Sequence, residues 1–206
     1  MAPALRILAL LGLTLLAAGC GYPPGTDAGD VEIAREAHVH DGPTEMTLYT
    51  VVNVRTGGGA HTGLMINGDE RVIFDPAGSF RHPEIVERGD MVYGVTEALR
   101  KTYIDYHVRP AYYMVAQTVA IDDATAARVI ALAEENGAAQ RAFCARATSR
   151  VLREAGFDTI DRTFYPGALM EDMAAIPGVE TRTITVENVE RDHPTYFTDA
   201  EPDYPV

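Results

Sequence analysis

A β-hairpin is predicted by the stretch HTGLMINGDERVIFD, which runs from His61 to Asp75 and decides how the rest of the chain is interpreted. Residues 61–66 and 71–75 are rich in side chains that favour strands. Between them lies Asn67-Gly68, a dipeptide typical of the tight turns that join antiparallel strands. The hairpin therefore predicts an antiparallel sheet in the first half of the chain.

The flanking segments predict further strands and several helices. Strands are expected where apolar residues are β-branched or alternate, over residues 46–55, 112–121 and 179–186. Helices are expected over residues 96–107, 122–135, 144–156 and 166–175, and a loop over residues 76–89. Because the strands are grouped in hairpins and do not alternate with helices, we expect an α+β fold with a small antiparallel sheet packed against helices.

The overall charge argues against two classes of partner. The 206 residues carry a formal net charge of −13, and an acidic surface repels the phosphates of nucleic acids and anionic lipids. We therefore expect no nucleic-acid partner. We also expect no cofactor and no metal site, because His38 and His40 form a pair without a nearby third ligand. His82, His107 and His193 are expected to be surface residues.

The N-terminal residues predict export and a lipid anchor. Arg6 precedes an apolar run over residues 7–18, which is too short to cross a hydrocarbon core of roughly 30 Å as a helix. A charged start, an apolar middle and small residues at the end are the layout of a secretory signal peptide. The string LAAGC at residues 16–20 resembles the lipobox of bacterial lipoproteins. The resemblance implies a signal peptide over residues 1–19 and a lipid on Cys20.

This anchor would hold the protein on a membrane of the bacterial cell envelope, facing the periplasm. The resemblance to lipoproteins also implies the outer rather than the inner membrane, because Gly21 replaces the Asp that retains many of them in the inner membrane. Residues 20–45 are rich in Gly, Pro and acidic side chains, so we predict a flexible tether there. The folded domain is expected over residues 46–186, and residues 187–206 are expected to form a loose acidic tail.

Lipidation of Cys20 would leave Cys144 as the one unmodified cysteine of the chain. Exported proteins usually pair their thiols, so a lone Cys is either buried and inert or retained for its reactivity. Cys144 stands where a helix is predicted to begin, and backbone N–H groups at a helix start favour a thiolate. The same groups could hold the oxyanion of a carbonyl under attack. Arg141 and Arg146 add positive charge nearby.

A nucleophilic thiol also needs a base, and His61 is the best candidate. Thr62 and Gly63 are small, which would leave room for a helix end to approach. Asp75 ends the next strand of the same hairpin and could hold the imidazole in place. The alternative is that Cys144 is a small buried hydrophobe and His61 a structural histidine.

These residues resemble a known family. A strand that starts His61-Thr62-Gly63, a hairpin, and a much later Cys144 that opens a helix are similar to the circularly permuted papain-like enzymes of the NlpC/P60 superfamily, in which the His precedes the Cys. The resemblance covers roughly residues 46–157. It implies a papain-like α+β fold, a thiol nucleophile at Cys144 and a base at His61. Asp75 lies farther from the His than the third polar residue commonly does in relatives, so His82 and Glu84 are alternatives for that role.

The sequence thus predicts a membrane-anchored thiol hydrolase of the cell envelope. The expected substrate is an amide bond, first of all in peptidoglycan peptide, because a tethered enzyme would lie beside that polymer. Two alternatives stay open. The same Cys-His site could serve a lipid acyltransferase or ester hydrolase, or the domain could bind an envelope partner without catalysis. A wide apolar groove at Cys144 would favour a lipid substrate, and a narrow polar one would favour a peptide.

Overall fold

Seven strands form one antiparallel sheet in the computed structural model, which describes residues 27–194. The strands are β1 (Glu45–Asn53), β2 (Gly59–Asn67), β3 (Arg71–Phe74), β4 (Glu87–Arg88), β5 (Met91–Val92), β6 (Tyr112–Ala120) and β7 (Glu180–Ile184). Their order across the sheet is β4-β5-β3-β2-β1-β6-β7. Within the described residues the helices are α2 (Asp30–Glu36), α3 (Glu97–His107), α4 (Asp123–Asn136), α5 (Cys144–Ala155) and α6 (Pro166–Ala174). The predicted α+β class and antiparallel sheet are confirmed.

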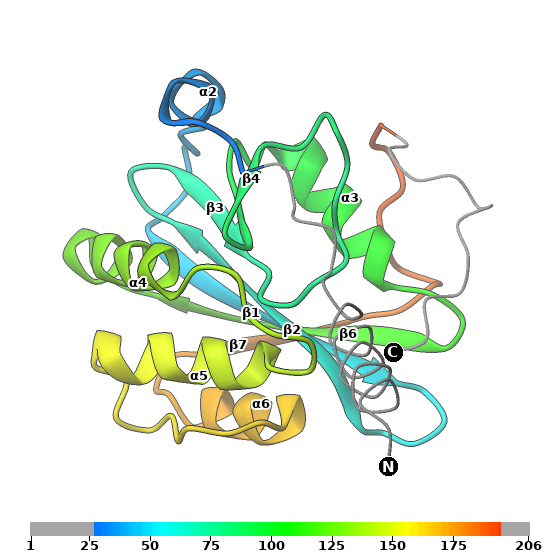
Figure 1. Cartoon of the computed structure of the whole chain (residues 1–206). Helices are drawn as coiled ribbons and strands as arrows, with labels where there is room; N and C mark the ends of the chain where they lie inside the picture. Colours follow the sequence, from blue (N-terminus) through cyan, green and yellow to red (C-terminus); the bar gives the residue numbers. More distant parts are fainter. Residues whose placement is uncertain (1–26, 195–206) are drawn as a thin grey trace, which may run out of the picture.

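The helices lie on both faces of the sheet (Figure 1). Helices α4, α5 and α6 cover one face, and α3 lies against the other. Strand β1 is consequently buried on both sides, with Leu48 and Tyr49 in different cores. This burial explains why its sequence is apolar almost throughout and does not alternate cleanly.

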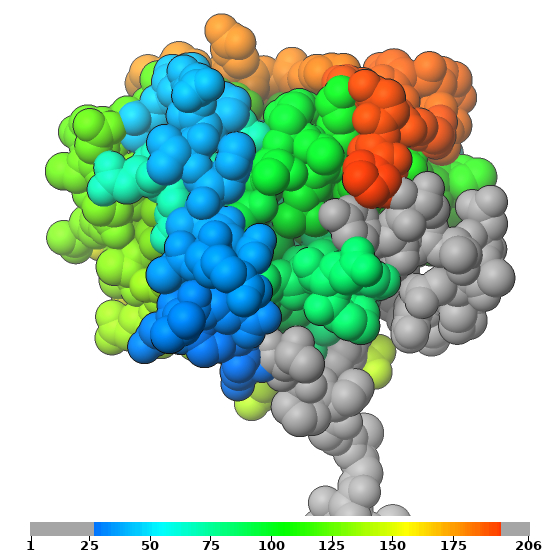
Figure 2. All heavy atoms as spheres, turned by 90° about the horizontal axis from the view of Figure 1, so that it is seen from above, coloured from blue at the N-terminus to red at the C-terminus, as the bar shows by residue number. Residues whose placement is uncertain are grey.

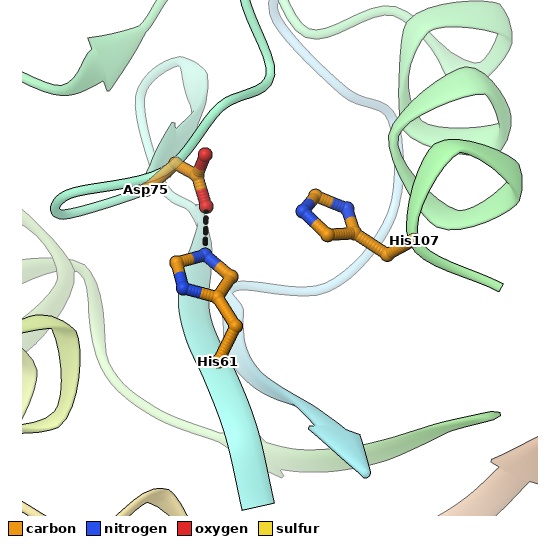
Figure 3. A group of neighbouring side chains, drawn as sticks. All are labelled: His61, Asp75 and His107. Atoms are coloured by element: carbon orange, nitrogen blue, oxygen red, sulfur yellow. Dashed lines mark hydrogen bonds and ion pairs between the residues drawn. The ribbon is translucent and has the colours of Figure 1, made fainter. Parts of the chain in front are cut away.

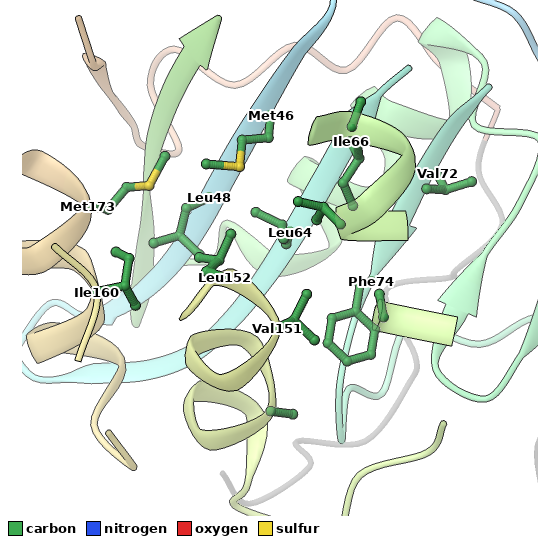
Figure 4. Close-up of a cluster of buried hydrophobic side chains, with 14 of the residues drawn as sticks. Met46, Leu48, Leu64, Ile66, Val72, Phe74, Val151, Leu152, Ile160 and Met173 are labelled. Atoms are coloured by element: carbon green, nitrogen blue, oxygen red, sulfur yellow. The ribbon is translucent and has the colours of Figure 1, made fainter. Parts of the chain in front are cut away.

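The core under α4, α5 and α6 is the larger of the two (Figure 4). Alternate residues of the central strands point into it, and α5 contributes one apolar stripe that faces the sheet. Its fully buried members include Met46, Leu48, Leu64, Ile66, Phe74, Val151, Leu152 and Met173. This packing fixes the axis of α5, and with it the position of the residue that begins that helix.

The second core lies under α3 and contains more polar groups. Tyr49, Met65 and Ile73 from the sheet pack against Tyr103 and Ile104 of this helix. The Phe80 ring meets the Tyr103 ring edge-on, with centroids 5.0 Å apart. The loop over residues 76–89, which we expected to lack apolar periodicity, is thus anchored by an aromatic side chain that is 1% exposed.

Helix ends follow the capping signals of the sequence. The side chain of Thr96 accepts a hydrogen bond from the N–H of Leu99 at the start of α3. The carboxylate of Asp122 does the same with Thr125 at the start of α4. Helix α5 ends at Gly156, whose φ of 109° lies in the region that glycine adopts without strain.

Strand β2 is longer than its partner β3. The last pair of the β2–β3 ladder joins Leu64 to Phe74, whereas β1 pairs with β2 as far as Gly59. In the described sheet, residues 59–63 of β2 therefore pair with β1 on one side and with no strand on the other. The other side of this part of β2 is open to an element from elsewhere in the chain.

The segment expected to be a flexible tether differs from that expectation in its described part, residues 27–45. It carries helix α2, and the N–H of Ala28 donates to the carbonyl of Glu87 at 2.9 Å. Farther along, the carbonyl of His38 accepts from the N–H of Arg71 at 2.8 Å. These bonds use backbone groups at the edge of the sheet, so the segment is held without an apolar pattern that sequence could reveal.

Part of the expected acidic tail is also attached. The ammonium of Lys101 lies 3.0 Å from Glu190 and 2.9 Å from Asp192, and Arg191 lies 3.1 Å from Asp105. Residues 187–194 thus pair with α3. Cys20, the signal peptide over residues 1–19 and the end of the tail lie outside the described residues. Among the described helices, none has the length and apolar character needed to span a membrane.

Candidate active site

His61 lies on β2 at a point where regular pairing is interrupted. Val51 pairs with His61, but the next residue, Val52, pairs with Gly59, so Ala60 is an extra residue in this strand. A bulge of this kind bends a strand and changes the direction of the side chain beside it. The irregularity therefore sets the direction of the His61 imidazole.

Asp75 holds this imidazole. The His61 Nε2 lies 2.7 Å from Oδ1 of Asp75 (Figure 3). The hydroxyl of Tyr103 donates to the same oxygen, also at 2.7 Å. Because the Asp75 side chain is 5% exposed, these donors replace water around a buried charge. The predicted His61–Asp75 contact is present, and Tyr103 is a further partner of the carboxylate that was not predicted.

Two glycines make this contact possible. A Cβ atom on Gly63 would overlap the Tyr103 hydroxyl, and one on Gly78 would overlap the Asp75 carboxylate. We predicted that small residues beside His61 leave room for a helix end. At Gly63 the space is instead filled by the Tyr103 hydroxyl, so this glycine serves the carboxylate and not the helix.

Cys144 is the first residue of α5, and this helix begins without a side-chain cap or an acidic residue in its first turn. The sulfur accepts hydrogen bonds from the backbone N–H groups of Thr62 and Ala145 and is hydrogen-bonded to the His61 side chain. Cys144 is a free cysteine and is 6% exposed. The start of α5 thus meets β2 on the side that β3 leaves open.

These contacts favour the charged forms of three side chains. Burial would raise the pKa of Cys144, but the hydrogen bond and charge of His61 and the two N–H donors lower it below its usual value. Burial would lower the pKa of His61, but Asp75 and Cys144 raise it to about 10. Burial would raise the pKa of Asp75, but His61 lowers it to about 2, with help from His107 and Tyr103. At neutral pH the site therefore holds an imidazolium and a carboxylate beside a thiol that ionises more readily than a free cysteine.

A second histidine lies beside this group, on the last turn of α3 (Figure 3). The His107 ring stacks on that of His61, with centroids 5.5 Å apart and planes 12° apart. Burial lowers its pKa to about 4, so the ring is neutral at pH 7. A neutral ring carries one N–H, and Nδ1 donates it to the carbonyl of Tyr103 at 2.8 Å. We had expected a surface residue here, although the four-residue spacing from Tyr103 places both side chains on one helix face.

Asp90 ties together the two loops that carry the site. Its carboxylate accepts the N–H of Ala77 at 2.8 Å and the N–H of Ala139 at 2.8 Å. Its carbonyl accepts the N–H of Asp75 at 2.8 Å. The loop that follows Asp75 is therefore fixed to the loop that leads to Cys144 through one side chain that is 2% exposed.

Strained backbone is concentrated around the same groups. Within residues 27–194 the non-glycine residues with positive φ are Ala77 at 57°, Asp90 at 65° and Ala142 at 65°. Ala77 follows Asp75 by two residues, and Ala142 precedes Cys144 by two. Left-handed conformations are costly for residues with a Cβ and are characteristic of functional sites.

An aromatic cluster borders the start of α5. Phe143 and Phe164 pack edge-on with ring centroids 5.2 Å apart, and both are exposed, as is Tyr165. The Arg146 guanidinium lies over the Phe164 ring at 5.5 Å from its centroid. Arg146 therefore contacts this cluster, while the groups that lower the pKa of Cys144 are His61 and the backbone donors.

The same side chains offer one arrangement for a metal ion. Ligand atoms of His61, Asp75 and His107 all lie within 4.8 Å of one another, and two histidines with a carboxylate suit a divalent transition metal. The direct His61–Asp75 hydrogen bond uses two of these ligand atoms, so an ion must replace that bond to enter. His40, which we considered as a ligand beside His38, instead has Nδ1 2.9 Å from the amide of Asn67.

The structure thus brings together three of the residues singled out in the sequence: Cys144, His61 and Asp75. Glu84, an alternative third residue, is exposed, and its N–H donates to Nδ1 of His82. No family model, curated protein or solved structure matches this chain. The chain is therefore described by its own geometry: an α+β protein with a buried Cys–His–Asp group at the junction of a helix start and a sheet.

Proposed function

We propose that this protein is a thiol hydrolase of the cell envelope that cleaves an acyl bond, first of all the amide bond of a peptidoglycan peptide, with Cys144 as nucleophile. The observation that carries the proposal is the continuous hydrogen-bonded series from Asp75 through His61 to the Cys144 sulfur. A buried thiolate–imidazolium pair supported by a carboxylate is costly to fold and serves acyl transfer well.

The reaction follows from the position of each group. The Cys144 thiolate attacks the carbonyl carbon, and the C=O electron pair moves to oxygen. The tetrahedral intermediate collapses, the C–N bond breaks, and the His61 imidazolium gives its proton to the leaving amine. Neutral His61 then takes a proton from water, which attacks the thioester and releases the carboxylic acid and the thiolate. Asp75 keeps the ring oriented and remains ionised throughout.

The oxyanion would be held at the start of α5. The first N–H groups of a helix have no backbone partner within the helix. Here the Ala145 N–H donates to the Cys144 sulfur, and neither a side-chain cap nor an acidic residue competes for the other donors of the first turn. The partial positive charge of the helix start also favours the negative oxygen. These donors are part of the rigid core packing of α5, so they need no rearrangement when the charge develops.

The similarity to the permuted papain-like enzymes supports this proposal in one respect. The order of the chain is His61, Asp75, Cys144, and the Cys begins a helix that packs on an antiparallel sheet. A papain-like fold of the permuted kind is therefore part of the proposal. Export, lipidation of Cys20 and attachment to a membrane are also proposed, because they rest on the sequence of residues 1–20.

A second candidate substrate is favoured by one observation. The exposed Phe143, Phe164 and Tyr165 form an apolar rim next to Cys144, and such a surface suits an acyl chain better than a polar peptide. A lipid acyltransferase or ester hydrolase would use the same thiol chemistry. Replacing Phe164 with Ser should reduce turnover of an ester with a long acyl chain and leave a short-chain ester unaffected.

The proposed function is tested with purified peptidoglycan fragments and two variants, Cys144→Ala and His61→Ala. Both should lose hydrolysis while their circular dichroism and thermal unfolding stay close to wild type. His193→Ala is a matched control, because this histidine pairs with Asp105 away from the thiol. Full activity in either site variant excludes the proposed mechanism. If iodoacetamide does not label Cys144 in folded wild-type protein, the thiol is inert and buried, and a binding role is favoured instead.

A further inference from the structure

A second polar site lies on the face of the sheet that carries α3. A hollow of about 400 Å³ opens there between the sheet, α3 and β7, which is within the range of small-ligand sites. Figure 2 looks down on this face, where residues 27–45 in blue lie beside the green surface of α3. None of the residues that line the hollow is Cys144, His61 or Asp75, so it is a different site from the one described above.

Arg71 is the most unusual residue of the hollow. It is 2% exposed, yet Nε has no hydrogen-bond partner among the described residues. Within residues 27–194 its side chain donates to Glu97, whose carboxylate lies 3.2 Å from Nη1. Arg100 binds the same Glu97 through Nε at 2.9 Å and through Nη2. One carboxylate is therefore shared by two guanidinium groups, and a buried charge with so few partners is costly unless a ligand completes it.

Charged side chains of both signs line the hollow. Arg71 of β3 and Arg100 of α3 meet at Glu97, and the exposed Arg182 of β7 also borders the hollow. Glu45 and Glu180 line it as well, and burial together with the Glu180 carboxylate raises the pKa of Glu45. Two carboxylates that repel each other are thus found in the same hollow as two guanidinium groups that share a single carboxylate.

We infer that this hollow binds a small zwitterion, an amino acid or a short peptide with free ends, whose carboxylate meets Arg71 and Arg100 and whose ammonium meets Glu45 and Glu180. Guanidinium groups bind carboxylates through paired N–H donors. An ammonium group placed between two carboxylates relieves their repulsion. A plain anion would satisfy the arginines but would leave Glu45 and Glu180 unpaired.

The test measures binding of the dipeptide L-alanyl-L-alanine by calorimetry, beside its N-acetylated and C-amidated forms. The free dipeptide should bind, and removal of either terminal charge should weaken binding by about tenfold or more, the usual effect of losing one charge-assisted hydrogen bond. Arg100→Gln and Glu180→Gln should each weaken it similarly. These two residues are chosen because both are more exposed than Arg71, whose replacement would perturb folding.

Two controls locate the site. Arg128→Gln removes an arginine from α4 on the other face of the sheet, and Cys144→Ala removes the thiol; both should bind the dipeptide as wild type does. The inference is overturned by an absence of binding up to about 10 mM, by equal affinity for the N-acetylated dipeptide, or by unchanged affinity in both hollow variants. Loss of binding in Cys144→Ala would also overturn it, because the dipeptide would then occupy the thiol site.

Discussion

Replacing Asp75 with Asn tests the charge that organises the candidate site. The change keeps the shape of the side chain and removes its negative charge, while the amide can still contact His61 and the Tyr103 hydroxyl. In the wild type, Asp75 and Cys144 raise the pKa of His61 to about 10 against the effect of burial. Without the carboxylate, Cys144 alone opposes the effect of burial, so the pKa falls from about 10 toward its usual 6.5 and the imidazole loses much of its charge at pH 7.

Loss of charge on His61 also changes the pKa of Cys144. The hydrogen bond and charge of His61 contribute most to lowering the thiol pKa. In the variant, that pKa therefore returns toward the usual 9.0 or rises above it through burial. A thiol with a pKa of about 9 is ionised in about one molecule in a hundred at pH 7. The more basic thiolate is also the better nucleophile, with a Brønsted slope of about 0.4–0.5, which recovers part of the rate. We therefore expect alkylation at pH 7 to slow by about ten- to a hundredfold.

The rate of alkylation by iodoacetamide is followed by mass spectrometry between pH 5 and about pH 9. Wild-type protein should reach its maximal rate at a lower pH than Asp75→Asn, whose rate should still be rising as pH approaches 9. Asp105→Asn is the matched control, because Asp105 also pairs with a histidine, His193, at 3.3 Å. An Asp75→Asn variant with the pH profile of the wild type would show that the carboxylate does not support a thiolate.

Three further predictions follow from other contacts of the site. Asp90→Ala removes a buried carboxylate that accepts three hydrogen bonds, two from backbone N–H groups and one from the Arg81 guanidinium. We therefore expect the free energy of unfolding in urea to fall by about 2–4 kcal/mol, and the alkylation rate to fall as well. Gly63→Ala should destabilise the wild type because its Cβ overlaps the Tyr103 hydroxyl, and less so in the Tyr103→Phe background; additive effects of the two changes would count against that contact. Zn²⁺ should inhibit alkylation by replacing the His61–Asp75 bond, and His107→Ala should weaken that inhibition by at least about tenfold; equal inhibition in the variant would place the ion elsewhere.

Much of the fold could be predicted because local signals decided it. Thr96 and Asp122 cap the helices that they were expected to begin, and β2 ends at Asn67, where the Asn67-Gly68 turn was expected. The very short β4 and β5 were not predicted, since two residues carry no periodicity. The packed segment over residues 27–45 was also missed, because backbone bonds to sheet edges leave no apolar pattern.

Some residues of the candidate site could likewise be predicted from local signals, and others could not. Cys144, His61 and Asp75 were found because each sits at a helix start, a strand or a strand end where its chemistry has an obvious use. Tyr103 and His107 were not, because their role depends on how α3 is placed against the sheet. Asp90 was missed for the same reason: its partners come from residues 13 and 49 positions away, and only the tertiary structure brings them together.

The most direct measurement of the chemistry at Cys144 is the location of a trapped acyl group. The protein is treated with p-nitrophenyl acetate, quenched in acid and analysed by peptide mass spectrometry. If the Cys144 thiolate is the nucleophile and His61 its partner, one acetyl group should be found on Cys144 as a hydroxylamine-sensitive thioester, and His61→Ala should show little of it. Acetylation at other residues alone, or equal acetylation of Cys144 in His61→Ala, would contradict a catalytic Cys–His pair.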